Sequence, residues 1–174
     1  MKYLLILVLG LSTLAAEGFV LSSSDLGRQL SKVQEYNHSG CNGQNKSPSL
    51  EWSNAPKSTR SFAITVFDPD APTGSGWWHW AAVNIPANIT EIKSGASGKM
   101  MPKGAAETLN DFGTAGFGGP CPPKGDKAHR YIFTIYALDV AILPVKAEMK
   151  DSDVAHLIDA HTISKASLVS RYRR

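Results

Sequence analysis

Residues 61–68, with the sequence SFAITVFD, restrict the fold more than any other segment. Successive side chains of an extended chain point to opposite faces, so Phe62, Ile64 and Val66 would share one face. The opposite face is also apolar or small, and a strand covered on both faces is typical of the centre of a sheet. Other layers must therefore pack on both sides of this strand. The residues on its second face are Ala63, Thr65 and Phe67.

Four further runs have strand chemistry, because they are rich in β-branched and aromatic residues and are punctuated by Pro, Gly and Asn. Residues 151–161 differ, because they place Val154, Leu157 and Ile158 at helical spacing behind acidic residues that can cap a helix. A second short helix is expected near residues 164–170. The sequence predicts a single β-dominated domain with a little helix towards its C-terminus. The four runs are 19–22, 49–52, 77–85 and 131–138.

The first 16 residues are typical of a secretory signal peptide. Lys2 precedes an apolar run at residues 3–11, which is too short to span a bilayer, and small residues end at Ala15 and Ala16. The alternative is a retained, buried strand or helix. We expect an exported product, periplasmic or secreted, in which residues 17–174 form one domain without stable membrane insertion.

Charge and cysteine content exclude some classes of protein. The formal net charge is +3, and the one basic cluster, residues 171–174, is interpreted as a solvated terminus, so we expect no nucleic-acid binding. Cys41 and Cys121 are the two cysteines, which in an oxidising compartment predict one disulfide. The alternative is two free buried thiols. Neither cysteine has a CxxC neighbour to support a zinc site or dithiol redox chemistry.

Two carboxylates follow the central strand in the sequence DPDAP. Asp68 precedes Pro69 and Asp70 follows it, and proline favours extended backbone in the residue before it. Positions two apart in an extended chain point to the same side, so these carboxylates are expected to share one direction. The alternative is that both aspartates hydrogen-bond to amides of the turn.

Two histidines lie at predicted strand ends. His79 stands between two tryptophans, where a lone histidine is ordinarily a core residue, and His129 precedes the strand at 131–138. The glycine- and proline-rich segment 116–125 comes just before His129. Together with the aspartates, these groups are interpreted as the rim of one pocket.

The run DPDAP, the histidine that follows it, the sequence GPCPPKG and the later HRY resemble the phosphatidylethanolamine-binding protein family. The resemblance is strongest to its bacterial YbhB/YbcL-type, Raf-kinase-inhibitor-like branch, and it runs from about residue 19 to the C-terminus. It implies a large antiparallel Greek-key sheet packed on a smaller sheet, with short C-terminal helices. It also implies a small anion pocket formed by Asp68, Asp70, His79, Gly119, Pro123, His129 and Tyr131.

The family pocket binds phosphate-bearing groups such as phosphorylethanolamine or phosphotyrosine-like ligands, and some members inhibit kinases or serine proteases. On this resemblance, a bond from Cys121 to Cys41 would tie the glycine-proline loop to the N-terminal region. The C-terminal helix that closes the pocket in larger eukaryotic members has no match after Ser164. That part of the family pattern is not carried over.

A phosphate beside two carboxylates needs compensating charge. The aspartates would favour charged histidines, backbone N–H groups of the loop would add donors, and a zwitterionic ligand could turn its ammonium to the aspartates and a tryptophan. The alternative is a hydrolase or metal-dependent enzyme using Asp68, Asp70, His79 and His129, but the chain lacks a nucleophile elbow and an HxH or HExxH pair.

We therefore expect a binding protein without a cofactor, not an enzyme. A kinase or protease target stays open, and residues 99–114 are the candidate for an exposed inhibitory loop.

Overall fold

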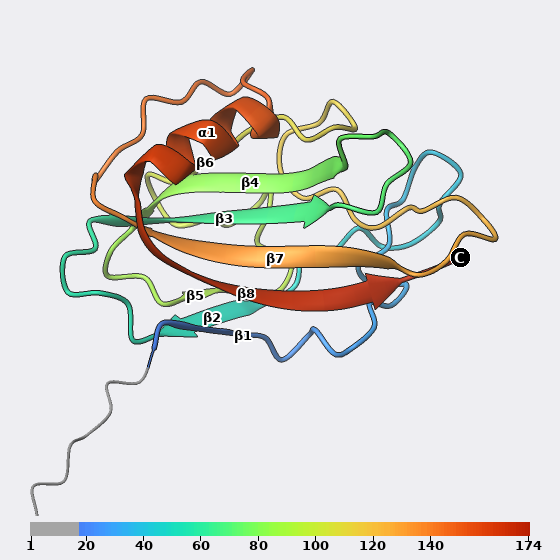
Figure 1. The fold of residues 1–174 in the computed structure, drawn as a ribbon, viewed down its shortest axis with the longest axis horizontal. Coiled ribbons are helices and arrows are strands. Elements are labelled where there is room, and N and C mark those ends of the chain that lie inside the picture. Colours follow the sequence, from blue (N-terminus) through green and yellow to red (C-terminus); the bar gives the residue numbers. More distant parts are fainter. Residues whose placement is uncertain (1–17) are drawn as a thin grey trace, which may run out of the picture.

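The computed structural model describes residues 18–174, so the predicted signal peptide lies outside the described residues. Two antiparallel sheets and one helix, α1 (Asp151–His161), form three layers, and the larger sheet lies in the middle (Figure 1). The smaller sheet has the order β1-β2-β5, formed by Val20–Ser22, Leu50–Ser53 and Glu91–Ile92. The larger sheet has the order β6-β4-β3-β7-β8, formed by Ala106–Glu107, Trp77–Pro86, Ser61–Asp68, His129–Leu138 and Thr162–Tyr172.

Strand β3 is the central strand, as its two apolar faces predict. It lies between β4 and β7 in the larger sheet. Phe62, Ile64 and Val66 pack into the core between the two sheets, whereas Ala63 packs into a second core beneath α1. The β-dominated fold class is therefore confirmed, and both layers that the sequence of β3 requires are present.

Strands β1, β2, β4 and β7 and helix α1 also lie where the sequence predicts them, whereas the two-residue strands β5 and β6 were not predicted and β8 replaces an expected helix. Residues 164–170, expected as a second short helix, belong to the long edge strand β8, so that expectation is wrong. Ala166 and Leu168 pack against the inter-sheet core, while Val169 is exposed, which is the alternation of a strand. Pairing with β7 along nearly the whole of β8 outweighs the helix-compatible composition.

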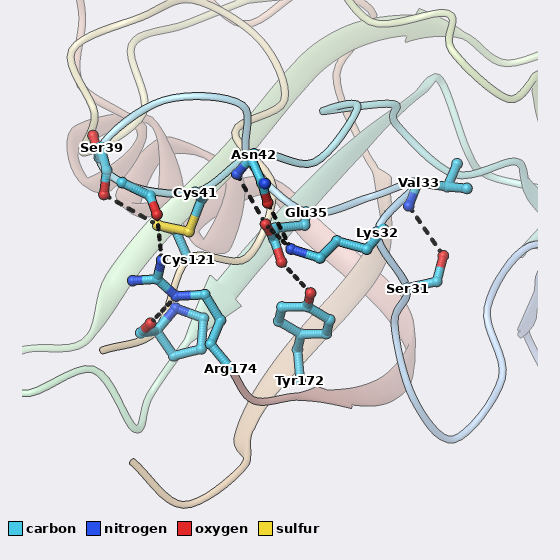
Figure 2. Close-up of polar contacts among 12 residues, drawn as sticks. Ser31, Lys32, Val33, Glu35, Ser39, Cys41, Asn42, Cys121, Tyr172 and Arg174 are labelled. Atoms are coloured by element: carbon cyan, nitrogen blue, oxygen red, sulfur yellow. Dashed lines mark hydrogen bonds and ion pairs between the residues drawn. A yellow bond between two sulfur atoms is a disulfide. The ribbon is translucent and has the colours of Figure 1, made fainter. Parts of the chain in front are cut away.

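The basic terminus is ordered, contrary to its interpretation as a solvated tail. Arg174 donates from Nε to the carbonyl of Pro122 at 2.7 Å and from Nη1 to that of Gly40 at 2.6 Å. Cys41 and Cys121 form the predicted disulfide at the same junction, with Cα atoms 5.9 Å apart (Figure 2). Two independent links therefore join segments 38–41 and 119–123.

Within residues 18–174, no helix has the length and apolar character needed to cross a bilayer.

Candidate functional site

Antiparallel pairing brings three strand ends to one edge of the larger sheet. The end of β3 lies beside the starts of β4 and β7, so Asp68 sits between His79 and His129. A cavity of about 230 Å³ opens at this edge. The residues that line it are Ser39, Asp68, Ala71, Pro72, Thr73, Trp77, His79, Phe112, Cys121, Pro122, Pro123, His129 and Tyr131.

His79 occupies a β-bulge. Val66 pairs with Trp80 and the next residue, Phe67, pairs with Trp78, so His79 is an extra residue on β4. A bulge changes the direction of a side chain and is common near binding sites. The loop replaces the missing strand contacts, since Gly118 donates its N–H to the His79 carbonyl at 2.8 Å.

The imidazole of His79 is fixed by the same loop. Its Nδ1 lies 2.7 Å from the Gly118 carbonyl, and because a carbonyl can only accept, Nδ1 carries the proton. The ring is almost completely buried, and burial lowers the pKa of His79 to about 4 against the pull of the Asp68 and Asp111 carboxylates. His79 therefore does not supply the expected cation at neutral pH, because desolvation outweighs the aspartates.

The side chains of Asp68 and His129 are joined by a hydrogen bond. His129 donates from Nδ1 to Oδ2 of Asp68 at 2.8 Å, and both side chains are buried. The other carboxylate oxygen of Asp68 accepts the backbone N–H of Asp70 at 2.8 Å. On its second nitrogen, His129 lies 3.5 Å from the partly exposed carboxylate of Asp126. The Asp68 carboxylate therefore faces the cavity with both of its oxygens already accepting a hydrogen bond.

Two buried donors at the cavity lack a hydrogen bond of good geometry. Nε1 of Trp77 makes no hydrogen bond in the described part of the chain, and the Tyr131 hydroxyl, which lies close to the Asp68 carboxylate, makes none of good geometry. Burial, together with the nearby Asp68 carboxylate, raises the pKa of Tyr131, so its hydroxyl stays protonated. Buried donors without partners cost free energy unless a ligand or water satisfies them.

Asp70 does not belong to the cavity. Strand β3 ends at Asp68, and the following turn directs Asp70 to Arg130, whose Nε and Nη2 each approach the carboxylate at 2.8 Å. Hydrogen bonds from Arg130 hold the pKa of Asp70 well below its usual range. The expectation that the two carboxylates share one direction is wrong, because the extended backbone on which it depends stops between them.

Gly119 is also outside the cavity, and the loop supplies no free N–H for an anion at the predicted positions. The N–H of Gly118 binds His79, and that of Gly119 donates to Oδ1 of Asn45 at 2.7 Å. Gly119 instead lets the loop pass close to the backbone of residues 34–36. Pro123 does line the cavity, as the resemblance implies.

The cavity walls are mainly apolar. Trp77 and Phe112 meet edge to face with ring centroids 5.3 Å apart, and Pro122 and Pro123 face the same space. Of the neighbouring tryptophans, Trp80 is a core residue whose indole N–H binds Glu107, so it does not reach the cavity. Sequence reasoning missed Phe112, which stands in a stretch without regular periodicity.

The metal-dependent alternative would need a cluster of metal-ligating side chains. In residues 18–174, no three His, Cys, Asp or Glu side chains are grouped so that they could hold a metal ion. The segment 99–114 is only partly exposed: Met100, Lys103 and Asp111 are exposed, whereas Thr108 and Asn110 are buried and Phe112 lines the cavity.

Acid should reveal the buried, neutral state of His79. Between pH 6.5 and about 4 the unfolded chain binds a proton at this residue that the folded chain does not. The free energy of unfolding should therefore fall by about 3 kcal/mol from this residue as pH drops through that window. Asp151 acts in the opposite sense, because burial raises its pKa to about 7 and its contribution is lost as pH rises.

A comparison with His79→Gln cancels the contribution of Asp151, since both proteins carry it. Urea unfolding between pH 4 and 7 should give a steeper decline in acid for the wild-type chain than for the variant. Parallel curves would contradict the assignment of a neutral His79.

Comparisons with known proteins agree with this architecture. Residues 22–173 match the family model described as phosphatidylethanolamine-binding protein. The chain is 46% identical over 162 residues to the UPF0098 protein YbcL of Escherichia coli K12, covering 90% of this chain and 88% of that protein. It is 42% identical over 156 residues to YbhB of the same organism, covering 87% and 98%.

Two solved structures have the same fold. The crystal structure of Escherichia coli YbcL superposes with a TM-score of 0.89 at 45% identity, over 91% of this chain and 99% of the other. A phosphatidylethanolamine-binding protein homologue from Chlamydia trachomatis superposes with a TM-score of 0.76 at 31% identity, over 90% and 98%.

Proposed function

The chain belongs to the phosphatidylethanolamine-binding protein family, and from this premise we propose that it is an exported binding protein whose cavity takes the phosphate-bearing end of a small molecule. The observation that carries the proposal is the convergence of three strand ends on one cavity. Asp68, His79 and Tyr131 meet there although they are far apart in the sequence, and the Tyr131 hydroxyl makes no hydrogen bond of good geometry.

The cavity suits a small molecule with a polar end and an apolar or cationic remainder. Trp77 and Tyr131 line the cavity, and their indole N–H and hydroxyl would become donors for phosphate oxygens if ligand binding exposed them. Phosphorylethanolamine fits this chemistry, with its ammonium towards Asp68 and the aromatic face of Trp77 or Phe112. A phosphotyrosine-like group fits it equally, because its ring can pack on the same apolar walls.

Binding without turnover is part of the proposal. Cys121 of the cavity wall is held in the disulfide with Cys41, so it is not a free thiol nucleophile. Export is proposed as well, because a disulfide such as Cys41–Cys121 persists in oxidising compartments. A regulatory role as a kinase or protease inhibitor is an extension of the same proposal that requires a protein target.

NMR shift titrations of residues 17–174 with phosphorylethanolamine, phosphotyrosine and inorganic phosphate test the proposal. We expect the amides around the cavity to shift as one set. In His79→Ala the affinity should fall about tenfold or more, which is the effect of losing one hydrogen bond to a charged group.

His161→Ala is the matched control, because His161 is partly exposed and pairs with Asp139, away from the cavity. Asp70→Asn should also keep near wild-type affinity, since this carboxylate faces Arg130. Equal affinity in His79→Ala and His161→Ala, or no shifts at cavity amides with any of the three ligands, would count against the proposal.

A further inference from the structure

We propose that the cavity binds a phosphate monoester together with one proton, held between the phosphate and Nε2 of His79, an inference that rests on the function proposed above. The observation behind it is the fixed tautomer of His79. Gly118 accepts the proton on Nδ1, so neutral His79 offers a lone pair at Nε2. Because the ring lines the cavity, that lone pair is what a ligand meets.

No neighbouring group fills this position. Tyr131 lies against the imidazole with ring centroids 5.1 Å apart, yet its hydroxyl makes no hydrogen bond of good geometry. His129 is turned to Asp68 and Asp126. The remaining charged group that acts on His79 is Asp111, a carboxylate, which cannot donate when ionised.

The cavity also lacks a permanent cation. No lysine or arginine is among the described residues that line it, and Arg130 at the same sheet edge is committed to Asp70. Asp68 adds a negative charge. A phosphate dianion would therefore bring its charge to a carboxylate and an imidazole lone pair, which repel it.

One proton removes this conflict. A phosphate monoester has a second pKa near 6, so at pH 7 it is mainly a dianion and must take up a proton from solvent to donate to Nε2. In the complex the proton can equally reside on His79, and the number of protons taken up per bound ligand is then still one. Above about pH 7 the free ligand and free His79 both lack it, so affinity should fall up to about tenfold per pH unit.

The same argument gives selectivity between ligands. A phosphodiester has no second proton to supply, so it must protonate His79 itself, whose pKa burial lowers to about 4. A monoester needs a proton that binds with a pKa near 6. A matched diester, which can bind only with a protonated His79 or without this hydrogen bond, is therefore expected to bind more weakly. Phosphate monoesters are therefore the ligand class.

Isothermal titration calorimetry with phenyl phosphate measures the proton directly. At pH 7.5, in two buffers of different ionisation enthalpy, the wild-type protein should take up close to one proton per ligand. Methyl phenyl phosphate, the matched diester, should bind more weakly than phenyl phosphate and without proton uptake from the ligand. In His79→Gln an amide N–H can donate without a proton, so binding should persist while proton uptake and the pH dependence disappear.

The outcomes separate this inference from the proposed function. Binding of phenyl phosphate by the wild-type protein without proton uptake overturns the inference and leaves the binding function standing. Unchanged uptake in His79→Gln assigns the proton to another group and also overturns it. Failure of both phenyl phosphate and phosphorylethanolamine to bind overturns both proposals. The wild-type measurements decide the matter even if the variant folds poorly.

Discussion

Replacing both cysteines, in a Cys41→Ala, Cys121→Ala variant, should lower the free energy of unfolding by about 4 kcal/mol and weaken ligand binding. The bond joins residues 80 apart in the sequence, and closing so long a loop removes much entropy from the unfolded chain. Cys121 lines the cavity next to Pro122 and Pro123. Losing the bond therefore loosens one wall of the site as well as destabilising the fold.

The variant should still fold, because Arg174 links the same two segments through the carbonyls of Gly40 and Pro122 (Figure 2). Glu35 adds further hydrogen bonds in this region, since it is fully buried and accepts from Lys32 and Tyr172. Denaturant unfolding and phenyl phosphate titration of the oxidised and double-variant proteins measure the two effects. Reductant should reproduce both effects in the wild-type protein and leave the variant unchanged.

Equal affinity in the oxidised and double-variant proteins would show that the cavity wall does not depend on the disulfide. The stability effect would then be purely a matter of chain entropy. A loss of affinity without a loss of stability would contradict the loop-closure argument instead.

The spacing of apolar residues along the chain was sufficient to predict the elements that keep the same buried faces along their whole length. The two apolar faces of Ser61–Asp68 require a central position, and the helical spacing of Val154 and Ile158 requires a helix with one buried face. Strand β8 escaped prediction, because its small and polar residues suit a short helix as well as an edge strand. Only its long-range pairing with β7 decides between them.

The candidate site was predictable where strand ends determine direction. Asp68, His79 and His129 lie on strands that meet at one edge, so their convergence follows from the topology, whereas Tyr131 came from the family resemblance. Asp70 stands one turn further along, where the nearest cation rather than the strand sets its direction.

The charge state of His79 was not predictable from the sequence. Its place between two tryptophans indicates a core residue, but the sequence does not show that desolvation of the ring outweighs the nearby aspartates, and this balance determines its pKa.

Gly119→Ala should destabilise the protein by about 3 kcal/mol or more, although Gly119 does not line the cavity. A Cβ at this position would overlap the backbone carbonyl oxygen of Gln34 and lie 2.7 Å from the backbone nitrogen of Tyr36. Backbone atoms cannot rotate away as a side chain does, so one of the two segments must move. Urea unfolding measures the loss, and Gly27→Ala is the matched control, because its nearest neighbour would be 3.9 Å away.

The same substitution distinguishes a packing role for Gly119 from the ligand contact that the family resemblance implies. If Gly119 acts through packing, displacement of the loop carries Cys121 and Pro122 with it, so affinity for phenyl phosphate falls together with stability. The N–H of Gly119 is already bound to Asn45, so it has no donor to lose to a ligand. A variant that kept wild-type stability yet lost phosphate binding would show that Gly119 contacts the ligand, and the loop would have to adopt another arrangement when the cavity is filled.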